Sequence, residues 1–200
     1  MLDEIRQYSI IRGILSSKLD LRDRAVSQIS DSVVFSYSKE SSFWHILLDS
    51  YLLSVKAMEN DFLLRGAIVC GKVIHIENEN KLFGPPAFLK AYDIENKKAK
   101  FPRIIIDDSI FNNEILNYSQ CTDPKFEFNK LLLKDFDEIF YVNYFDKLYT
   151  GAHTGSKGEK EHRMLLHESL KELERNMEEN VGVKCKYLWF KEKYEGQNGI

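Results

Sequence analysis

The pattern of hydrophobic and polar residues divides the chain into short, distinct segments. Apolar residues near the start recur at a helical spacing, so residues 1–24 are predicted to form a helix. Residues 26–37 have the character of a strand. The apolar run over residues 42–58 predicts a buried helix, which Ser41 or Ser42 can cap. The chain therefore opens with a helix, a strand and a second helix.

The middle of the chain alternates between strand-like and helix-like segments. Residues 62–77 are rich in β-branched residues and glycine, which is typical of one strand or of two strands joined by a bend. A Gly-Pro-Pro break then precedes a short helix within residues 83–99, and Pro85 or Pro86 suits its first turn. The almost wholly apolar residues 101–107 predict one more short strand.

The last part of the chain has a less regular pattern. Residues 137–145 predict a strand, residues 151–160 a flexible loop, and residues 161–178 a strongly amphipathic helix. The aromatic side chains within residues 183–194 are expected to pack back onto the body of the protein. Strands that alternate with helices indicate an α+β or α/β fold.

Composition narrows the class of protein. The chain has 200 residues, of which 44% are hydrophobic and 30% charged, so one packed domain with an appendage is expected. The net charge is -3 and no block of Lys or Arg is present, which argues against a nucleic-acid-coating protein. We therefore expect no nucleic-acid partner.

Cysteine use and hydropathy suggest a compartment. Three widely spaced cysteines, Cys70, Cys121 and Cys185, form neither a disulfide framework nor a metal-ligand pattern, which favours a reducing, cytoplasmic setting. Charges interrupt every apolar stretch before the length of a membrane helix is reached, and the start lacks the order of a secretion signal. No membrane association is expected.

Asp31 is the first candidate for chemistry. It lies between Ser30 and Ser32, just ahead of an apolar run, where burial of an unpaired carboxylate would cost several kcal/mol. A carboxylate flanked by hydroxyl groups at a strand end is a common way to hold Mg²⁺ against substrate phosphates. A turn or capping role for Asp31 is the alternative, and local sequence favours it.

Two further segments offer anion-binding features. Small residues at Gly66, Ala67 and Gly71 allow close approach of a backbone or a ligand, and Arg65 can then direct its guanidinium group at a phosphate. Gly84 lies before a helix N-terminus, which offers free N–H groups, although the prolines remove some donors. Taken singly, the first segment is better explained as a tightly packed strand with a surface arginine, and the second as an ordinary helix start.

Other motifs carry no predicted chemistry. His153, His162 and His167 are interpreted as surface residues, because the spacing of five between the last two is poor for a shared metal. Residues 151–158 contain glycines and a lysine without the spacing of a phosphate-binding P-loop.

The order of these segments resembles the catalytic domain of class III nucleotide cyclases, in particular the bacterial pyrimidine cyclases of the Pycsar antiphage systems. The match comprises Ser-Asp-Ser at residues 30–32, the helix after it, Arg-Gly-Ala-Ile-Val-Cys-Gly at residues 65–71, and the segment 83–95 followed by residues 101–107. It covers about residues 25–108, and the tail looks like the C-terminal extension of that branch.

The resemblance implies an α+β fold with a ferredoxin-like core in residues 1–108 and a C-terminal helical and strand extension in residues 109–200. It implies a head-to-tail homodimer with active sites at the interface. The implied reaction converts CTP or UTP into a 3′,5′-cyclic monophosphate and pyrophosphate with Mg²⁺ or Mn²⁺, as a signal in antiphage defence.

The resemblance also assigns roles to individual residues. Asp31 matches the second of two metal-binding acids, and Arg65 matches the arginine of the glycine-bearing strand, in which Ala67 takes the first glycine position. The implied substrate contacts are Ser27, Ser32, Gly71, Phe83, Gly84, Phe88 and Tyr92.

Two departures leave alternatives open. No Phe-x-Asp-x-x-Gly-Phe strand with the first metal acid precedes Asp31, and Asp3 is a poor substitute because it begins a helical pattern. Ser27 stands where adenylate cyclases have a base-reading lysine, which is consistent with a pyrimidine pocket. The chain is thus expected to lack its opening strand. A non-catalytic cyclase-like domain that binds nucleotide or a partner subunit, and a structural α+β protein, are the competing interpretations.

Overall fold

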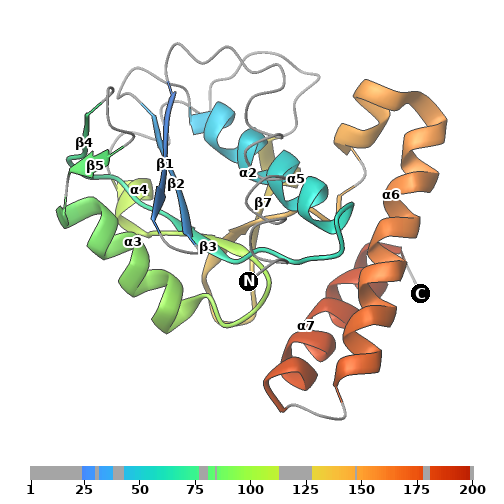
Figure 1. The fold of residues 1–200 in the computed structure, drawn as a ribbon. Helices are drawn as coiled ribbons and strands as arrows, with labels where there is room; N and C mark the ends of the chain where they lie inside the picture. Colours follow the sequence, from blue (N-terminus) through green and yellow to red (C-terminus); the bar gives the residue numbers. More distant parts are fainter. Residues whose placement is uncertain are drawn as a thin grey trace.

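The protein has an α+β architecture of short sheets and helices (Figure 1). The computed structural model describes residues 24–29, 32–37, 43–76, 81–83, 85–112, 128–146, 148–177 and 181–198. The α+β part of the prediction is confirmed.

A four-stranded sheet forms the centre of the described core. It contains β3 (Gly66–Ile68), β6 (Ile104–Ile106), β8 (Phe140–Val142) and β7 (Leu132–Lys134), in the order β3–β6–β8–β7. Strands β3 and β6 are parallel, whereas β8 is antiparallel to both of its neighbours. All three isoleucines of β6 are buried, as expected for a strand covered on both faces. The strands predicted within residues 101–107 and 137–145 are confirmed.

A separate hairpin precedes this sheet. Strands β1 (Arg24–Ile29) and β2 (Ser32–Tyr37) pair antiparallel, with Ile29 opposite Ser32. The prediction of one strand over residues 26–37 is therefore wrong in detail, because the described residues form two antiparallel strands on either side of Ser30 and Asp31. Those two residues lie outside the described part of the chain.

Further short elements lie between the hairpin and β6. The segment predicted as one strand or two forms two, β3 and β4 (Ile74–Ile76), and β4 pairs antiparallel with β5 (Lys81–Phe83). Helix α3 (Pro85–Lys98) then packs against β3 and leads back to β6. It begins on Pro85, because a proline lacks only an N–H that the first helical turn leaves unbonded.

Helix α2 (Phe43–Met58) supplies much of the core. Leu47, Tyr51, Ala57 and Met58 are among its buried side chains, and the helix contacts β8 of the sheet. This confirms the buried helix predicted for residues 42–58. The short helices α4 (Ser109–Asn112) and α5 (Phe128–Leu131) follow β6 and precede β7.

Two long helices lie side by side along one flank of the molecule (Figure 1). They are α6 (Leu148–Asn176) and α7 (Val181–Asn198). The loop predicted for residues 151–160 is wrong, because α6 runs through them. Helical glycines cost only about 1 kcal/mol each, and the strongly amphipathic stretch that follows offsets this cost.

The aromatic end of the chain packs onto the core, as predicted. Trp189 and Phe190 of α7 are 3% and 0% exposed. The indole ring of Trp189 stacks on Phe101, with 5.6 Å between ring centroids. Phe145 meets Phe190 at 4.9 Å in an edge-on arrangement. Within the described residues, no helix combines the length and apolar character needed to cross a membrane.

Candidate functional site

The structure locates the predicted site residues only in part. Asp31 and Gly84 lie outside the described residues. Ser27 belongs to β1 and Phe83 to β5, but their side chains are likewise outside the described part. Ser32 is the first residue of β2 and is half-buried. A complete catalytic centre is therefore not seen among the described side chains.

Arg65 is bound by helix α3. Its Nε lies 2.5 Å from Oε1 of Glu95, and the two side chains are 46% and 21% exposed. This pairing occupies the inner edge of the guanidinium group. No hydrogen bond from its two terminal nitrogens is found among the described residues. Arg65 can thus present a fork of donors to an anion while Glu95 limits its rotation.

Gly71 makes the close approach that the sequence suggested, but the approaching group belongs to the chain itself. A Cβ atom at Gly71 would lie 2.9 Å from Cβ of Ala87, in the first turn of α3. A Cβ at Gly66 would meet Ile104 Cγ1 at an ordinary 3.6 Å. The absence of a side chain at Gly71 therefore allows the segment after β3 to pack against the start of α3.

A second polar cluster, which the sequence did not reveal, lies at the carboxyl end of β6. Nζ of Lys90 donates to Asp107 and, at 2.9 Å, to Oγ of Ser109, and the Ser109 hydroxyl donates to Asp107. Burial raises the pKa of Asp107, but the hydrogen bonds from Lys90 and Ser109 outweigh it, so the pKa lies below its usual value. Lys90 and Arg65 together tie α3 to β6 and β3.

Helix α3 also carries an exposed apolar surface. Leu89 and Tyr92 are 57% and 55% exposed. The ring of Tyr92 lies 6.2 Å from that of Phe88, which is half-buried. Two of the three predicted substrate-contacting aromatics thus lie together on one helix, and Tyr92 is accessible to a ligand or partner.

The most heavily buried charges have a structural role. Arg103 is 0% exposed and pairs with Asp135 and Asp137, with 3.0 Å from its Nη1 to Oδ1 of Asp137. Asp135 also accepts from Nε1 of Trp189 at 2.6 Å and from Nζ of Lys193 at 2.7 Å. Helix α7 is therefore fastened to the β7–β8 turn and to the start of β6.

The pKa of Asp135 reflects these contacts. Burial raises the pKa of the Asp135 carboxyl. The hydrogen bonds from Lys193 and Trp189 lower it by more than burial raises it, so the pKa lies below its usual value. The pKa of Lys193 is raised, because its contacts with Asp135 and Glu192 outweigh burial. The sequence did not indicate the contact between Asp135 and Lys193, since the two residues are far apart along the chain.

The histidines correct one prediction. His162 is 1% exposed, so its interpretation as a surface residue is wrong. It lies on α6 at a position that faces Tyr51 of α2, where the amphipathic pattern buries it. His167 is exposed, as predicted, and the side chain of His153 lies outside the described part.

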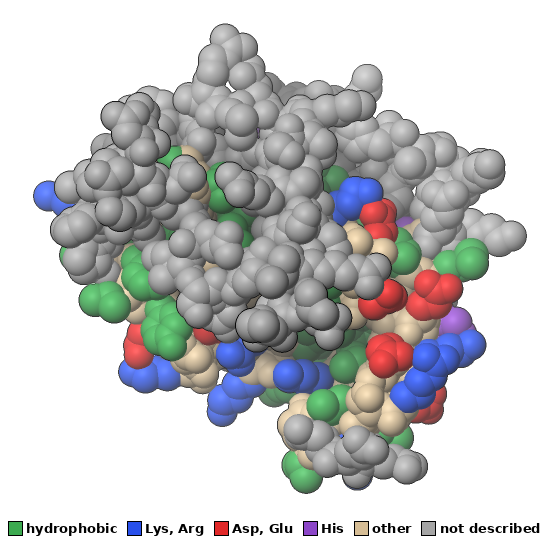
Figure 2. Space-filling view, in the orientation of Figure 1, with side chains coloured by type: hydrophobic (Ala, Val, Ile, Leu, Met, Phe, Trp, Pro, Cys, Tyr) green, Lys and Arg blue, Asp and Glu red, His purple; other side chains and the backbone are tan. Residues whose placement is uncertain are grey.

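Surface charge and metal ligands give no further site. Lys, Arg, Asp and Glu side chains are interspersed over the described surface in Figure 2. The described residues bring no three His, Cys, Asp or Glu side chains together as a metal site. Comparison with protein families, curated proteins and solved structures found no match to this chain.

Proposed function

We propose that this chain is a class III cyclase-like domain that converts a pyrimidine nucleoside triphosphate, CTP or UTP, into a 3′,5′-cyclic monophosphate. The observation that carries the proposal is the order of Asp31, Arg65 with Gly71, helix α3 and strand β6, which follows Phe-Pro-Arg at residues 101–103. The parallel pairing of β3 with β6, and the packing of α3 on β3, are compatible with such a core.

The described residues supply two elements that this function needs. Arg65, held at Nε by Glu95, can bind a phosphate of the triphosphate through its outer nitrogens. Tyr92 and Phe88 offer aromatic faces on which a pyrimidine base can stack. Both groups act by orienting substrate, which is the main protein contribution to phosphoryl transfer.

Metal binding is the open requirement of the proposal. Mg²⁺ or Mn²⁺ would neutralise charge that develops on the phosphates, and Asp31 is the expected ligand. The described side chains do not form a complete ligand set for such an ion. The proposal places the family's first metal acid, which has no match before Asp31, on a strand beside β3, at the edge of the sheet that the described strands leave unpaired.

The proposed role of the product in the cell rests on the resemblance alone. The cyclic nucleotide would act as a signal in antiphage defence, in the cytoplasm and from a head-to-tail homodimer. The alternative is a non-catalytic domain that binds nucleotide or a complete partner subunit. Binding of CTP or UTP without turnover distinguishes the alternative from the enzyme.

Turnover of the four nucleoside triphosphates with Mn²⁺ tests the proposal. The chain is assayed as given and with an added N-terminal segment that carries the family's opening strand. We expect cyclic CMP or cyclic UMP from at least the extended form, and loss of the product in Asp31→Asn. An extended chain that binds CTP or UTP without forming any cyclic product would support the alternative, and absence of both binding and turnover would refute the two together.

A further inference from the structure

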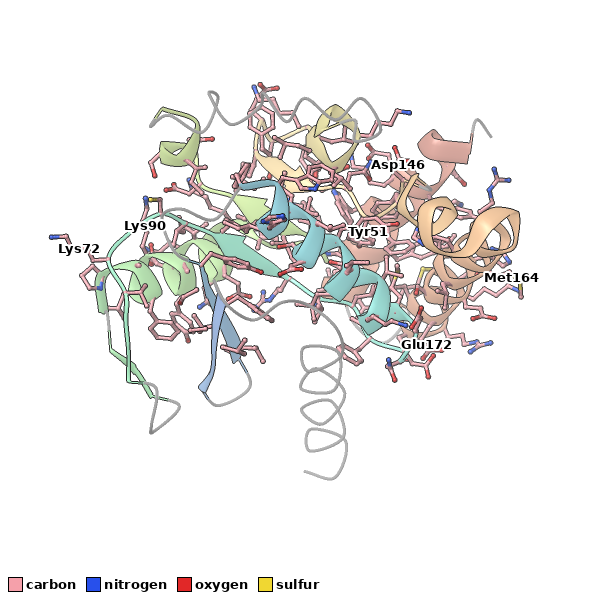
Figure 3. All side chains as sticks on the ribbon, turned by 90° about the horizontal axis from the view of Figure 1, so that it is seen from above. Tyr51, Lys72, Lys90, Asp146, Met164 and Glu172 are labelled. Carbon is pink, nitrogen blue, oxygen red and sulfur yellow. The ribbon has the colours of Figure 1, made fainter. Side chains whose placement is uncertain are left out.

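His162 occupies the contact between α6 and α2. Its ring is 1% exposed and stacks against Tyr51, with 6.4 Å between centroids and 28° between planes. One turn further along α6, Leu166 is 2% exposed, so this part of the helix is seated in the core. Figure 3 shows Tyr51 beside Asp146 at the same junction, where its hydroxyl donates to the Asp146 carbonyl at 3.2 Å.

The imidazole of His162 lacks partners for its polar atoms. Neither Nδ1 nor Nε2 has a hydrogen bond to a described residue. Backbone groups of Tyr144 and Phe145 lie close enough to the ring to favour its protonated form, although neither makes a well-aligned hydrogen bond to it. An uncharged ring tolerates such a site better than an imidazolium does, because a buried cation without a hydrogen-bonded partner costs several kcal/mol.

The charged and titratable groups around His162 do not offset this cost. Tyr51 faces the ring from α2, Glu59 lies just after α2, and Tyr144 and Asp146 lie on the segment after β8. The backbone of Tyr144 and Phe145 and the two carboxylates favour the proton. Burial outweighs them, so the pKa of His162 is below its usual value of about 6.5.

We propose that His162 makes the contact between α6 and α2 sensitive to acid. When its ring takes up a proton, α6 separates from α2, while α7 keeps its attachment to the sheet. The second part follows from the Asp135 cluster. Asp135 holds Trp189 and Lys193 of α7, and this carboxylate stays ionised well below the pH at which a histidine titrates. The two helices therefore have anchors that respond to different pH ranges.

The direction of the effect follows from linkage. The folded state disfavours the proton, so the α6–α2 contact is fully stable above a pH of about 6.5. As the pH falls from there towards the folded pKa of His162, the opened state binds more protons and gains population, by up to roughly tenfold for each pH unit. Above neutrality the contact should be insensitive to pH.

Hydrogen–deuterium exchange tests the pH dependence of the α6–α2 contact. It is measured on the whole chain at pH 7.5, 6.5 and 5.5 and corrected for the intrinsic pH dependence of amide exchange. At pH 5.5 we expect amide protection to fall several-fold in α2 and in residues 162–176 of α6. Protection in α7 around Trp189 should change little. His162→Gln should remove the pH dependence. His167→Gln, which changes an exposed histidine of the same helix, should retain it.

A measurement on the unmodified chain guards against a variant that fails to fold. In an NMR titration, the ring of His162 should titrate below the ordinary histidine value of about 6.5. A midpoint at or above that value would overturn the proposal. So would equal acid-induced loss of protection in His162→Gln, or simultaneous opening of α7.

Discussion

The carboxylate of Glu95 lies 2.5 Å from Nε of Arg65, so helix α3 holds the arginine that leads into β3. The contact uses the inner nitrogen of the guanidinium group. If Arg65 binds a triphosphate, Glu95 sets the direction in which the outer nitrogens point. The pair is compatible with both roles that the sequence left open for Arg65, a surface arginine and an oriented phosphate ligand.

Arg65→Ala should weaken binding of CTP or UTP by roughly tenfold to a hundredfold, since a charge-assisted hydrogen bond contributes about 1.5–3 kcal/mol. Glu95→Gln, which keeps an acceptor for Nε, should weaken binding less than Glu95→Ala. Unfolding free energies should change by less than about 1 kcal/mol, because the pair is partly exposed. Isothermal titration calorimetry and urea unfolding measure both effects.

Lys97→Ala is the matched control, since Lys97 forms an exposed ion pair with Asp93 on the same helix, at 2.5 Å. It should leave nucleotide affinity unchanged. If Lys97→Ala and Arg65→Ala weaken binding equally, the effect is one of general charge and Arg65 has no special orientation.

The ion cluster around Asp135 makes a strong prediction for stability. Asp135→Asn should destabilise the protein by up to about 3–5 kcal/mol, because the buried Arg103 would keep only the partly exposed Asp137 as a counter-charge. Glu138→Gln, which breaks an exposed pair with Lys134, should cost less than about 1 kcal/mol. Urea unfolding followed by circular dichroism measures the two variants. A loss below 1 kcal/mol in Asp135→Asn would show that the cluster does not hold α7.

The same cluster predicts an acid dependence. Because the folded-state pKa of Asp135 is lowered, its contribution is complete above the ordinary value of about 3.9 and is lost as the pH falls from there through the folded pKa. The stability difference between the parent chain and Asp135→Asn should therefore be constant from pH 7 to about 5 and shrink below about 4. A difference that stays constant down to pH 3 would contradict the lowered pKa.

Segments with a strong local pattern were predictable from the sequence. Helix α2 has a continuous apolar stripe and two serines ahead of it in the sequence, and β6 is an uninterrupted isoleucine run. The helix over residues 151–160 was not predictable, because its glycines favour a loop and only the downstream amphipathic stretch extends the helix through them.

The site was less predictable than the fold, because its contacts join distant residues. Asp135 and Trp189 are 54 positions apart, and nothing in either local sequence indicates the bond between them. The burial of His162 depends on the position of α2 more than one hundred residues earlier. Gly71 was correctly identified as a point of close approach, but only the structure shows that Ala87 is the approaching group.

Gly71 provides a test of that approach. Gly71→Ala would place a methyl group 2.9 Å from Ala87 Cβ, so α3 or the segment after β3 must shift. Overpacking of this kind costs about 1–3 kcal/mol. Gly66→Ala adds a methyl group at a normal 3.6 Å from Ile104 and should be close to neutral. Thermal unfolding of the two variants measures the difference, and equal melting temperatures would contradict the close contact.

The exposed residues of α3 connect the structure to the proposed homodimer. If this helix lies at the interface, Leu89→Ser and Tyr92→Ser should each raise the dimer dissociation constant by about tenfold or more, since apolar side chains near an interface centre contribute most of the binding energy. Sedimentation velocity over a range of concentrations measures this constant. Because both side chains are already exposed in the single chain, the free energy of unfolding at low concentration should change little.

Met164 supplies the control for that experiment. It is 52% exposed, nearly as much as Tyr92, but it lies on α6, away from α3 (Figure 3). Met164→Ser should leave the dimer intact. If Met164→Ser dissociates the dimer and the α3 variants do not, the chains associate through the helical pair. A parent chain that remains monomeric at every concentration would remove the homodimer from the proposed function. The exposed apolar face of α3 would then be available to another partner.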